Sequence, residues 1–263
     1  MRARYPYYYA TEWARDWLTT LDERRTFQQL RGGHEVCWVD EPNPLVTVRI
    51  PTYNTGPVVA ERALASAVGQ TYENLEILVI GDNTDDETAD AVRSVGDERI
   101  RFINLPARGV YPEIAHLRRK VAGAHPMTVG NQLARGAWIA PLDDDDEFLP
   151  DHVEVLLEAA RAGRYEMVYS KAEDEVEPDQ WVITGSQPLA QGEISHLTVL
   201  LRSELRFMPY SMTCWKRREP SDWNLWRRMS RIGVRIGFLD RVTSRYYLSE
   251  AGRTRQARRA ATG

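Results

Sequence analysis

Short apolar runs of strand length alternate with amphipathic helical segments through the middle of the chain. The strand-like runs are rich in Val, Ile and Leu and lie at residues 45–50, 75–80, 100–105 and 138–142. Helical patterns lie between them, at residues 59–69, 84–95 and 127–134. Thr84 and Glu87 have the spacing of a capping box for the second of these helices. Strands separated by helices of this length form a mostly parallel sheet that helices cover on both faces, so the pattern predicts an α/β fold.

The first part of the chain carries a different pattern. Residues 11–31 predict one amphipathic helix, with Thr11 as its N-cap and with Trp13, Trp17 and Leu21 at i, i+4 spacing. Two glycines at 32–33 are expected to end it. This helix could pack on the main body or on a second copy of the chain in a homodimer, and packing on the main body is favoured.

The pattern beyond Pro150 mixes both kinds of element. A helix is predicted at 151–162 and a strand at 166–170. The acidic residues 171–180 are interpreted as a solvated hairpin tip that leads into residues 181–184. An apolar helix is expected after His196, and His196 itself could touch substrate or serve as a cap. The last predicted elements are strands at 234–239 and 243–248.

Length, composition and charge narrow the class of protein. At 263 residues the chain can form one large domain or two joined lobes. A net charge of −4 and the lack of a large basic block argue against a nucleic-acid partner. Cys37 and Cys214 have no zinc or redox spacing, which favours reduced thiols. The sequence contains no run of 18 apolar residues and opens without an apolar signal region, so a soluble, cytoplasmic protein is expected.

The candidate chemistry begins where the strand at 138–142 ends, in the run Asp143-Asp144-Asp145-Asp146-Glu147. Two carboxylates ~5.5 Å apart repel by about 3 kcal/mol at an effective dielectric near 20. The run therefore needs either open solvent or a cation. Carboxylate oxygens suit Mg²⁺ and Mn²⁺, which bind through one or two of them together with waters and substrate phosphates. A solvated acidic turn that caps a helix is the alternative.

Two more loops follow strands of the same predicted sheet, at residues 51–56 and 81–84. In such sheets, ligands bind outside the carboxyl ends of the strands. The ring of Tyr53 can stack on a base, Asp82 can accept from a base N–H or a ribose hydroxyl, and the aspartate run can hold a metal between two phosphates. Together they outline a site for a nucleotide diphosphate. Taken singly, Tyr53 could be an ordinary turn residue and Asp82 a support for its turn.

Three segments carry a family resemblance. Residues 45–54 read LVTVRIPTYN, residues 70–79 read QTYENLEILV, and residues 136–146 read GAWIAPLDDDD after Asn131. In this order they resemble the family 2 inverting glycosyltransferases of GT-A fold, whose DXD motif corresponds to the aspartate run. The resemblance covers roughly residues 46–153 and rests on several spaced motifs rather than one. It implies a Rossmann-like, mostly parallel sheet with a smaller acceptor-binding lobe.

The resemblance also implies roles for individual residues. The nucleotide-binding residues would be Pro51, Thr52, Tyr53, Asn54, Asp82, Asn131, Asp143 and Asp144. Asp145 would bind the metal, Mn²⁺ or Mg²⁺, with Asp143 beside it. In families of this kind two Asp usually precede the small residue of the second loop, whereas Gly81 stands in the first of these positions here.

A second acidic motif lies at residues 219–226. Ser221 is a candidate N-cap, which would place Asp222 in the first helical turn, where the helix dipole favours an ionised carboxylate. Such a carboxylate beside Trp223 and Trp226 suits a general base for a sugar hydroxyl, and a capping Asp without a catalytic role is the alternative. The segment resembles the motif that supplies the base in these transferases, so Asp222 is the predicted catalytic residue.

Residues 249–263 are rich in Arg and Ala. Arg253 and Arg255 could fold over a diphosphate as a lid, or the segment could be a disordered basic tail. His196, Trp223, Trp226, Arg253 and Arg255 are the predicted contacts to the acceptor or the lid.

These observations give one functional hypothesis and two alternatives. The chain is expected to move a sugar from a nucleotide-diphosphate donor of UDP type to an acceptor hydroxyl, with inversion and with a metal ion. The expected divisions are an N-terminal helical extension (1–44), a donor half (45–160), an acceptor half (161–248) and the basic tail (249–263). A nucleotidyltransferase of similar fold and a catalytically silent nucleotide-sugar-binding module are the alternatives.

Overall fold

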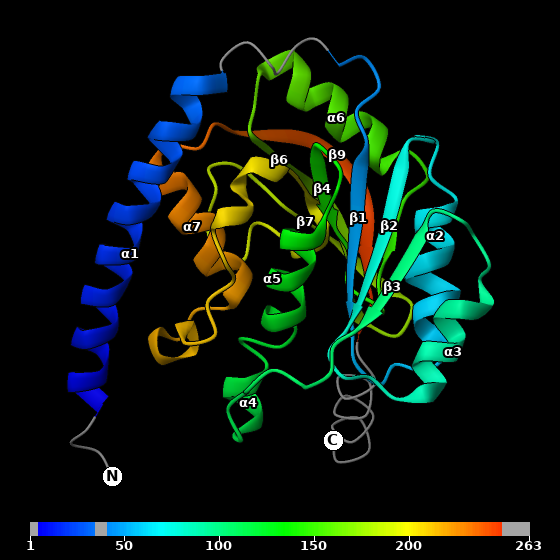
Figure 1. Cartoon of the computed structure of the whole chain (residues 1–263), viewed down its shortest axis with the longest axis horizontal. Coiled ribbons are helices and arrows are strands. Elements are labelled where there is room, and N and C mark those ends of the chain that lie inside the picture. Colours follow the sequence, from blue (N-terminus) through cyan, green and yellow to red (C-terminus); the bar gives the residue numbers. More distant parts are fainter. Residues whose placement is uncertain (1–4, 35–40, 249–263) are drawn as a thin grey trace.

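The computed structural model describes residues 5–34 and 41–248. Residues 1–4, 35–40 and 249–263 lie outside this part, and with them Cys37, Arg253 and Arg255. Figure 1 shows a curved central sheet with helices on both faces and the long helix α1 (Tyr5–His34) along one side. The predicted α/β architecture is confirmed.

A nine-stranded sheet forms the centre of the described part. The parallel half contains β1 (Val46–Thr52), β2 (Leu75–Gly81), β3 (Ile100–Asn104) and β4 (Trp138–Pro141). The half of mixed direction contains β5 (Glu147–Phe148), β6 (Met167–Glu177), β7 (Gln180–Thr184), β8 (Val199–Arg202) and β9 (Ile236–Tyr246). Their order is β3-β2-β1-β4-β8-β6-β9-β5, with β7 paired to β6. The four strands predicted for the first half are all present.

The helices on the two faces enclose separate apolar cores. One face holds a π-helical turn (Val59–Leu64), α2 (Ala65–Val68), α3 (Asp86–Ser94) and α6 (His152–Gly163). The other holds α5 (Ala124–Leu133), α7 (Ser221–Ile232) and α1. The short α4 (Ala115–Arg118) precedes α5, and 3₁₀ turns lie at His196–Thr198, Ser203–Phe207 and Cys214–Arg217. Because side chains alternate along a strand, Val48 and Ile50 of β1 enter the first core, whereas Arg49 faces α5.

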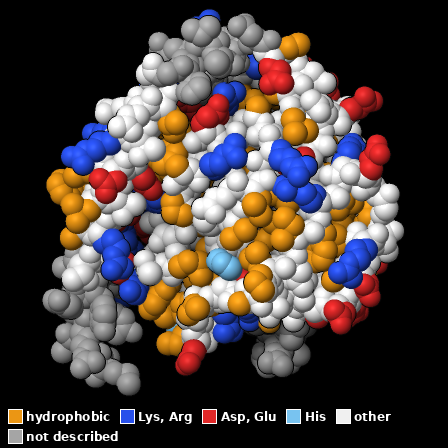
Figure 2. Space-filling model, viewed as in Figure 1, with side chains coloured by type: hydrophobic (Ala, Val, Ile, Leu, Met, Phe, Trp, Pro, Cys, Tyr) orange, Lys and Arg blue, Asp and Glu red, His pale blue; other side chains and the backbone are white. Residues whose placement is uncertain are grey.

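The surface carries charge and apolar groups together. Figure 2 shows Lys and Arg side chains scattered among hydrophobic and acidic ones on the face seen in Figure 1. Exposed large apolar side chains include Trp13 and Trp17 of α1 and Ile183 of β7. None of the helices in the described ranges is both long and apolar enough to span a bilayer.

The capping box predicted at Thr84 and Glu87 is wrong. The N-cap of α3 is Asp85, whose side chain accepts from the backbone N–H of Thr88 at 3.0 Å. The hydroxyl of Thr84 instead accepts from the backbone N–H of Asn54 at 2.8 Å. Thr84 therefore joins the first and second loops rather than beginning the helix.

Three predictions for the second half also need correction. The residues expected to form a helix after His196 form β8, because a fully buried strand and a buried helical segment show the same apolar run. The acidic residues 171–177 continue β6 and pair with β7, so the predicted hairpin to residues 181–184 is present, but its tip is confined to the turn between Glu177 and Gln180. The two strands predicted at 234–248 are the single strand β9.

Helix α1 packs on the main body, as favoured, but through a different face than its tryptophans suggest. It begins before Thr11 and continues through the two glycines to His34. Trp13 and Trp17 are 52% and 62% exposed. The buried positions are instead Glu12, Asp16, Glu23 and Phe27. The contact between α1 and the body is therefore largely ionic.

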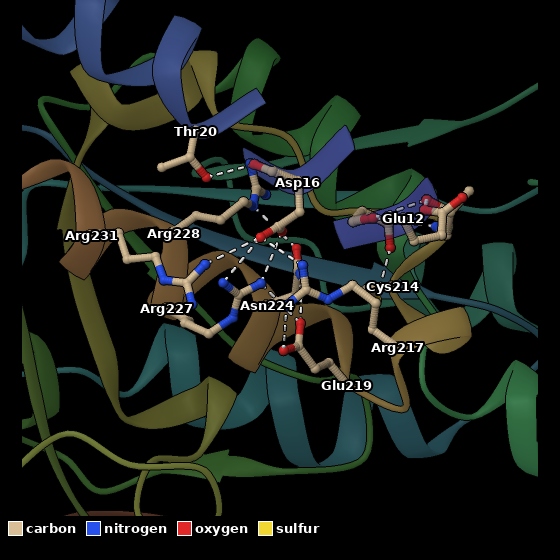
Figure 3. A network of polar contacts seen from close by, with 12 residues as sticks. Glu12, Asp16, Thr20, Cys214, Arg217, Glu219, Asn224, Arg227, Arg228 and Arg231 are labelled. Atoms are coloured by element: carbon tan, nitrogen blue, oxygen red, sulfur yellow. Dashed lines mark hydrogen bonds and ion pairs between the residues drawn. The ribbon is translucent and has the colours of Figure 1, made fainter. Parts of the chain in front are cut away.

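Figure 3 shows the ion pairs between α1 and the segment around α7. Asp16 accepts from Arg227 at 2.9 Å and forms an ion pair with Arg217 at 2.6 Å. Glu12 pairs with Lys216 at 3.1 Å, and Glu23 pairs with the buried Arg228. Buried charges of this kind depend on their partners, because a lone charge left in the interior is costly. Asp16 lies at the centre of the network and holds α7 against α1.

Asp16→Asn tests this contact. Burial alone would raise the pKa of Asp16, but the hydrogen bond from Arg227 and the charges of Arg227 and Arg217 outweigh it and hold the pKa below 3.8. Because the folded pKa is lowered, the stabilisation is present above about pH 4 and is lost as the pH falls through the folded pKa. We expect the variant to lose about 3–5 kcal/mol of unfolding free energy at pH 7 and less in acid, as measured by denaturant titration.

Asp22→Asn is the matched control on the same helix, because Asp22 is exposed and its pair with Arg25 is solvated. This change should cost less than about 1 kcal/mol. Equal losses in the two variants at pH 7 would contradict the assigned role of Asp16.

Candidate active site

A cavity of about 530 Å³ opens where β1, β2 and β4 end. It is lined by loop residues from all three strands and by the start of α7. The predicted residues that line it are Pro51, Thr52, Tyr53, Asp82, Asp143, Asp144, Asp145, His196 and Asp222. The structure therefore brings together side chains that are up to 171 positions apart between Pro51 and Asp222.

The first loop orients the aspartate run. The backbone N–H of Tyr53 donates to Oδ2 of Asp144 at 3.3 Å, and the hydroxyl of Thr55 donates to the same oxygen at 3.0 Å. Arg62 donates to the backbone carbonyl of Asp145 at 3.0 Å, so this hydrogen bond does not involve the carboxylate of Asp145. The loops after β1 and β4 thus form one surface.

The carboxylates of this run repel one another. Burial, followed by the charge of Asp145, raises the pKa of Asp144 to about 7. Burial, followed by the charge of Asp143, raises the pKa of Asp145 to about 6. A cation bound beside them would relieve this repulsion and return both pKa values toward the ordinary range.

The donor set fits a hard divalent cation that is shared with a ligand. Among the residues that the structure describes, no group of three or more His, Cys, Asp and Glu side chains is arranged to enclose a metal ion. Mg²⁺ and Mn²⁺ are commonly held by one or two carboxylates, with phosphates and waters completing the shell. Asp145 and its neighbours offer that number of ligands.

Asp143 is supported by a buried chain of polar groups that the sequence did not reveal. Arg49 is fully buried in β1 and donates to Oδ1 of Asn131 at 3.2 Å and to Nε2 of His196 at 3.0 Å. Because a guanidinium only donates, Nε2 of His196 accepts and its Nδ1–H is left to donate to Asp143 at 3.0 Å. Burial would raise the pKa of Asp143, but its pairing with His196 and the charge of Arg49 hold the pKa below the ordinary range.

One feature of the sequence could have pointed to Arg49. A charged residue in the middle of an apolar parallel strand has to be paired when it is buried. Gly130 of α5 lies above it, and a Cβ at Gly130 would approach the Arg49 side chain to 2.7 Å. The glycine therefore leaves room for the guanidinium stem beneath the helix.

Asp82 is almost fully buried and already engaged. Its oxygens accept from the backbone N–H of Gly109 at 2.9 Å and the hydroxyl of Tyr111 at 2.6 Å, and Nδ1 of His125 lies 3.2 Å away. The same loop places the guanidinium of Arg108 3.5 Å from the centroid of the Tyr53 ring. The sequence prediction missed these partners: Arg108, Gly109 and Tyr111 lie in the irregular stretch after β3, and His125 lies at the start of α5.

Gly81 departs from the family pattern for a steric reason. A Cβ at this position would lie 2.5 Å from Oδ1 of Asn104. That oxygen accepts from the backbone N–H of Thr84 at 2.9 Å. An acidic side chain at position 81 would therefore break the contact that shapes the second loop.

Asp222 lies at the start of α7 and faces the cavity. Pro220, rather than Ser221, occupies the N-cap position, and Oδ1 of Asp222 accepts from the backbone N–H of Trp223 at 2.6 Å. Burial raises the pKa of Asp222, although His196 and the Trp223 N–H oppose the rise. A carboxylate with a raised pKa is a better proton acceptor than an ordinary one.

Four other predicted residues do not line the cavity. Asn54 has a left-handed backbone (φ 52°), and its Oδ1 accepts from the backbone N–H of Asp85 at 3.0 Å. Asn131 is buried beneath Arg49. Trp226 is fully buried in the core, where it cannot contact an acceptor, and Trp223 is half-buried outside the lining.

Solved structures with a similar fold define the fold class of the protein. The fold resembles TarS of S. aureus, solved as residues 1–349 with UDP-GlcNAc, with a TM-score of 0.62 and 15% identity over 78% of this chain and 59% of that one. It also resembles the mannosyltransferase PcManGT of Pyrobaculum calidifontis, solved with GDP-Man and Mn²⁺, with a TM-score of 0.58 and 17% identity over 98% of this chain and 72% of that one. The chain has the GT-A fold of glycosyltransferases.

The family follows from the sequence match. The model of glycosyl transferase family 2 matches residues 47–181, just over half of the chain, and the chain belongs to this family. It is 34% identical over 119 residues to the succinoglycan biosynthesis protein ExoO of Rhizobium meliloti, a match over 45% of this chain and 30% of that protein. It is 24% identical over 201 residues to chondroitin synthase of Pasteurella multocida, over 72% of this chain and 19% of that protein. The chain thus spans less than a third of the length of these two relatives.

Asp146→Asn tests the repulsion within the run. Asp146 is fully buried, its Oδ1 accepts from the backbone N–H of Tyr247 at 2.7 Å, and burial followed by the charges of Asp145 and Asp143 raises its pKa well above 3.8. Because the folded pKa is raised, ionisation costs stability as the pH rises above about 4. The neutral amide should raise the unfolding free energy at pH 8 by about 1–3 kcal/mol in EDTA, and by less at pH 4.

Asp97→Asn is a control for which the opposite change in stability is expected. The hydrogen bond from Arg99 lowers the pKa of Asp97, so its loss should destabilise the protein at pH 8. Thermal unfolding of both variants at the two pH values makes the comparison. A fall in stability of Asp146→Asn at pH 8 as large as that of Asp97→Asn would refute the proposed repulsion.

Proposed function

We propose that the protein transfers a sugar from a nucleotide-diphosphate donor, of UDP type, to an acceptor hydroxyl with inversion at the anomeric carbon. One observation carries this proposal: a single cavity is lined by Tyr53 and Asp82, by the aspartate run, and by Asp222. Tyr53 and Asp82 are suited to bind a nucleoside, and the aspartate run is suited to bind a metal-bound diphosphate. Asp222 is suited to remove a proton from a hydroxyl group. Membership of glycosyl transferase family 2 supports the reaction class.

The nucleoside would bind between Pro51, Thr52, Tyr53 and Asp82. Arg108 covers one face of the Tyr53 ring, so a stacking base has to displace a cation–π contact worth roughly 0.5–2 kcal/mol. A carboxylate has about four lone-pair sites, and three groups already lie within hydrogen-bonding distance of Asp82. One site is left for a base N–H or a ribose hydroxyl.

Asp145 would hold Mn²⁺ or Mg²⁺, with Asp144 toward the ribose or the donor sugar. When bound, the cation would neutralise the charge that develops on the departing diphosphate. The structurally similar PcManGT was solved with GDP-Man and Mn²⁺, which supports a role for a divalent ion. Asp143, fixed by His196, keeps the run in one orientation.

Asp222 would remove the proton from the acceptor hydroxyl as that oxygen attacks the anomeric carbon. The bond to the diphosphate breaks on the opposite face, through a state with oxocarbenium character, so configuration inverts. The raised pKa of Asp222 and its position in the cavity support this role. The nearby His196 lowers the pKa of Asp222 and so opposes part of the effect of burial.

Asp145→Asn tests the metal site. The amide keeps the shape of the side chain but removes the anionic ligand, so metal-dependent donor turnover should fall by roughly 10²–10³-fold. Folding should be retained, because the lost charge is one that its neighbours repel. Donor hydrolysis with UDP- and GDP-sugars, with and without Mn²⁺, measures the effect, and Asp90→Asn on the exposed face of α3 is the control. Unchanged metal dependence would remove Asp145 from the site.

Asp222→Asn tests the base. Transfer should fall by roughly 10²–10⁴-fold, whereas the affinity for nucleoside diphosphate with Mn²⁺ should stay within about twofold in calorimetry. A variant that transfers at the wild-type rate would refute the assignment. Release of pyrophosphate from a nucleoside triphosphate by the wild-type protein would favour a nucleotidyltransferase instead.

A further inference from the structure

Three consecutive cations line the cavity but have no place in the proposed reaction. Arg118, Arg119 and Lys120, here called the cation triplet, lie at the end of α4 and in the turn that follows it. Arg119 is exposed, and Arg118 and Lys120 are half-buried. The sequence showed only a basic stretch before α5, and the fold turns it toward the cavity.

The cation triplet has no acidic partner within the described ranges, where no carboxylate oxygen lies within 4.0 Å of its nitrogens. Two of its side chains donate to backbone carbonyls: Arg118 donates to Glu113 at 3.2 Å and Lys120 donates to Arg218 at 2.8 Å. Other arginines with a partly exposed side chain do have carboxylate partners, such as Arg93 with Asp90 and Arg245 with Glu173. The positive charge of the triplet is therefore available to a ligand.

The cation triplet is tied to the loop that carries Asp222. The backbone N–H of Ser221 donates to the carbonyl of Lys120 at 2.7 Å, so Lys120 lies directly against the residue before Asp222. The donor side of the cavity is built from other segments, with Arg108 over Tyr53 and Arg62 behind Asp145. The triplet is thus placed beside the group that would deprotonate the acceptor.

We propose that the acceptor is anionic, and that its phosphate or carboxylate group binds the cation triplet while its hydroxyl faces Asp222. This inference rests on the proposed function, since it takes the ligand beside Asp222 to be the acceptor. Guanidinium and ammonium groups bind such anions through charge-assisted hydrogen bonds. The aspartate run lines the same cavity and would repel an anion that is not paired with a cation. An anionic acceptor is therefore expected to enter beside the cation triplet rather than beside the aspartate run.

Matched acceptor probes test the class of ligand. The protein, saturated with Mn²⁺ and the nucleoside diphosphate that binds best, is titrated with glucose, glucuronate and glucose 1-phosphate in calorimetry or ligand-observed NMR. The two anionic probes should bind about tenfold or more tightly than glucose, and the difference should shrink as salt is raised. The carboxylate and phosphate probes distinguish the two sources of negative charge.

The double variant Arg118→Gln/Arg119→Gln tests the residues. It should reduce the preference for the anionic probes about tenfold and leave nucleotide affinity within about twofold. Arg119→Lys should keep most of the preference, which shows that charge rather than folding is measured. Arg25→Gln on α1, an exposed arginine far from the cavity lining, is the control for a general change in charge.

The outcomes separate this inference from the proposed function. Equal binding of glucose and both anionic probes overturns the anionic acceptor, as does an unchanged preference in the double variant. A tenfold loss of nucleotide affinity in the double variant assigns the triplet to the donor diphosphate and also overturns it. Failure of every nucleoside diphosphate to bind the wild-type protein overturns the proposed function itself, and this inference with it.

Discussion

Repulsion among the carboxylates at the end of β4 is the constraint around which the site is built. Asp143 is stabilised by His196 and Arg49, and Asp144 accepts from the first loop, whereas burial and Asp143 leave Asp145 with a raised pKa. Hydrogen-bond donors from neighbouring elements thus reach the carboxylates of Asp143 and Asp144. What remains is Asp145, where the charge of Arg62 does not offset burial and the charge of Asp143, and a divalent cation would do so.

A second ionic contact determines where α7 lies, and therefore where Asp222 lies. Asp16 and Glu23 of α1 pair with Arg227 and Arg228, which extend from α7 toward α1. The two residues just before them on the helix, Leu225 and Trp226, pack into the core instead. One helix thus has an ionic face, an apolar face and an N-terminus that opens on the cavity. A shift of α1 would move the proposed base because the two helices are joined by paired charges.

The sequence predicted what depends on local pattern and missed what depends on partners. The parallel strands and the convergence of Tyr53, Asp82 and the aspartate run follow from apolar periodicity and from the rule that ligands lie at the carboxyl ends of such strands. The strand β8 was mistaken for a helix because periodicity cannot separate two buried elements of that length. The acidic buried face of α1 and the partners of Arg49 could not be predicted locally, since each depends on groups brought together only by folding.

The cavity residues already satisfy one another, and this bears on how the proposed donor would bind. A nucleoside base that stacks on Tyr53 would replace the contact from Arg108. Stacking therefore contributes to the binding free energy only the difference between two similar interactions. Asp82 likewise offers little unused hydrogen-bonding capacity. The larger gain would come from relieving the repulsion at Asp144 and Asp145, and only a cation can provide that. Because the diphosphate and the cation each reduce the cost of placing the other's charge in the cavity, the two would bind cooperatively, and the affinity for either one would depend on the presence of the other.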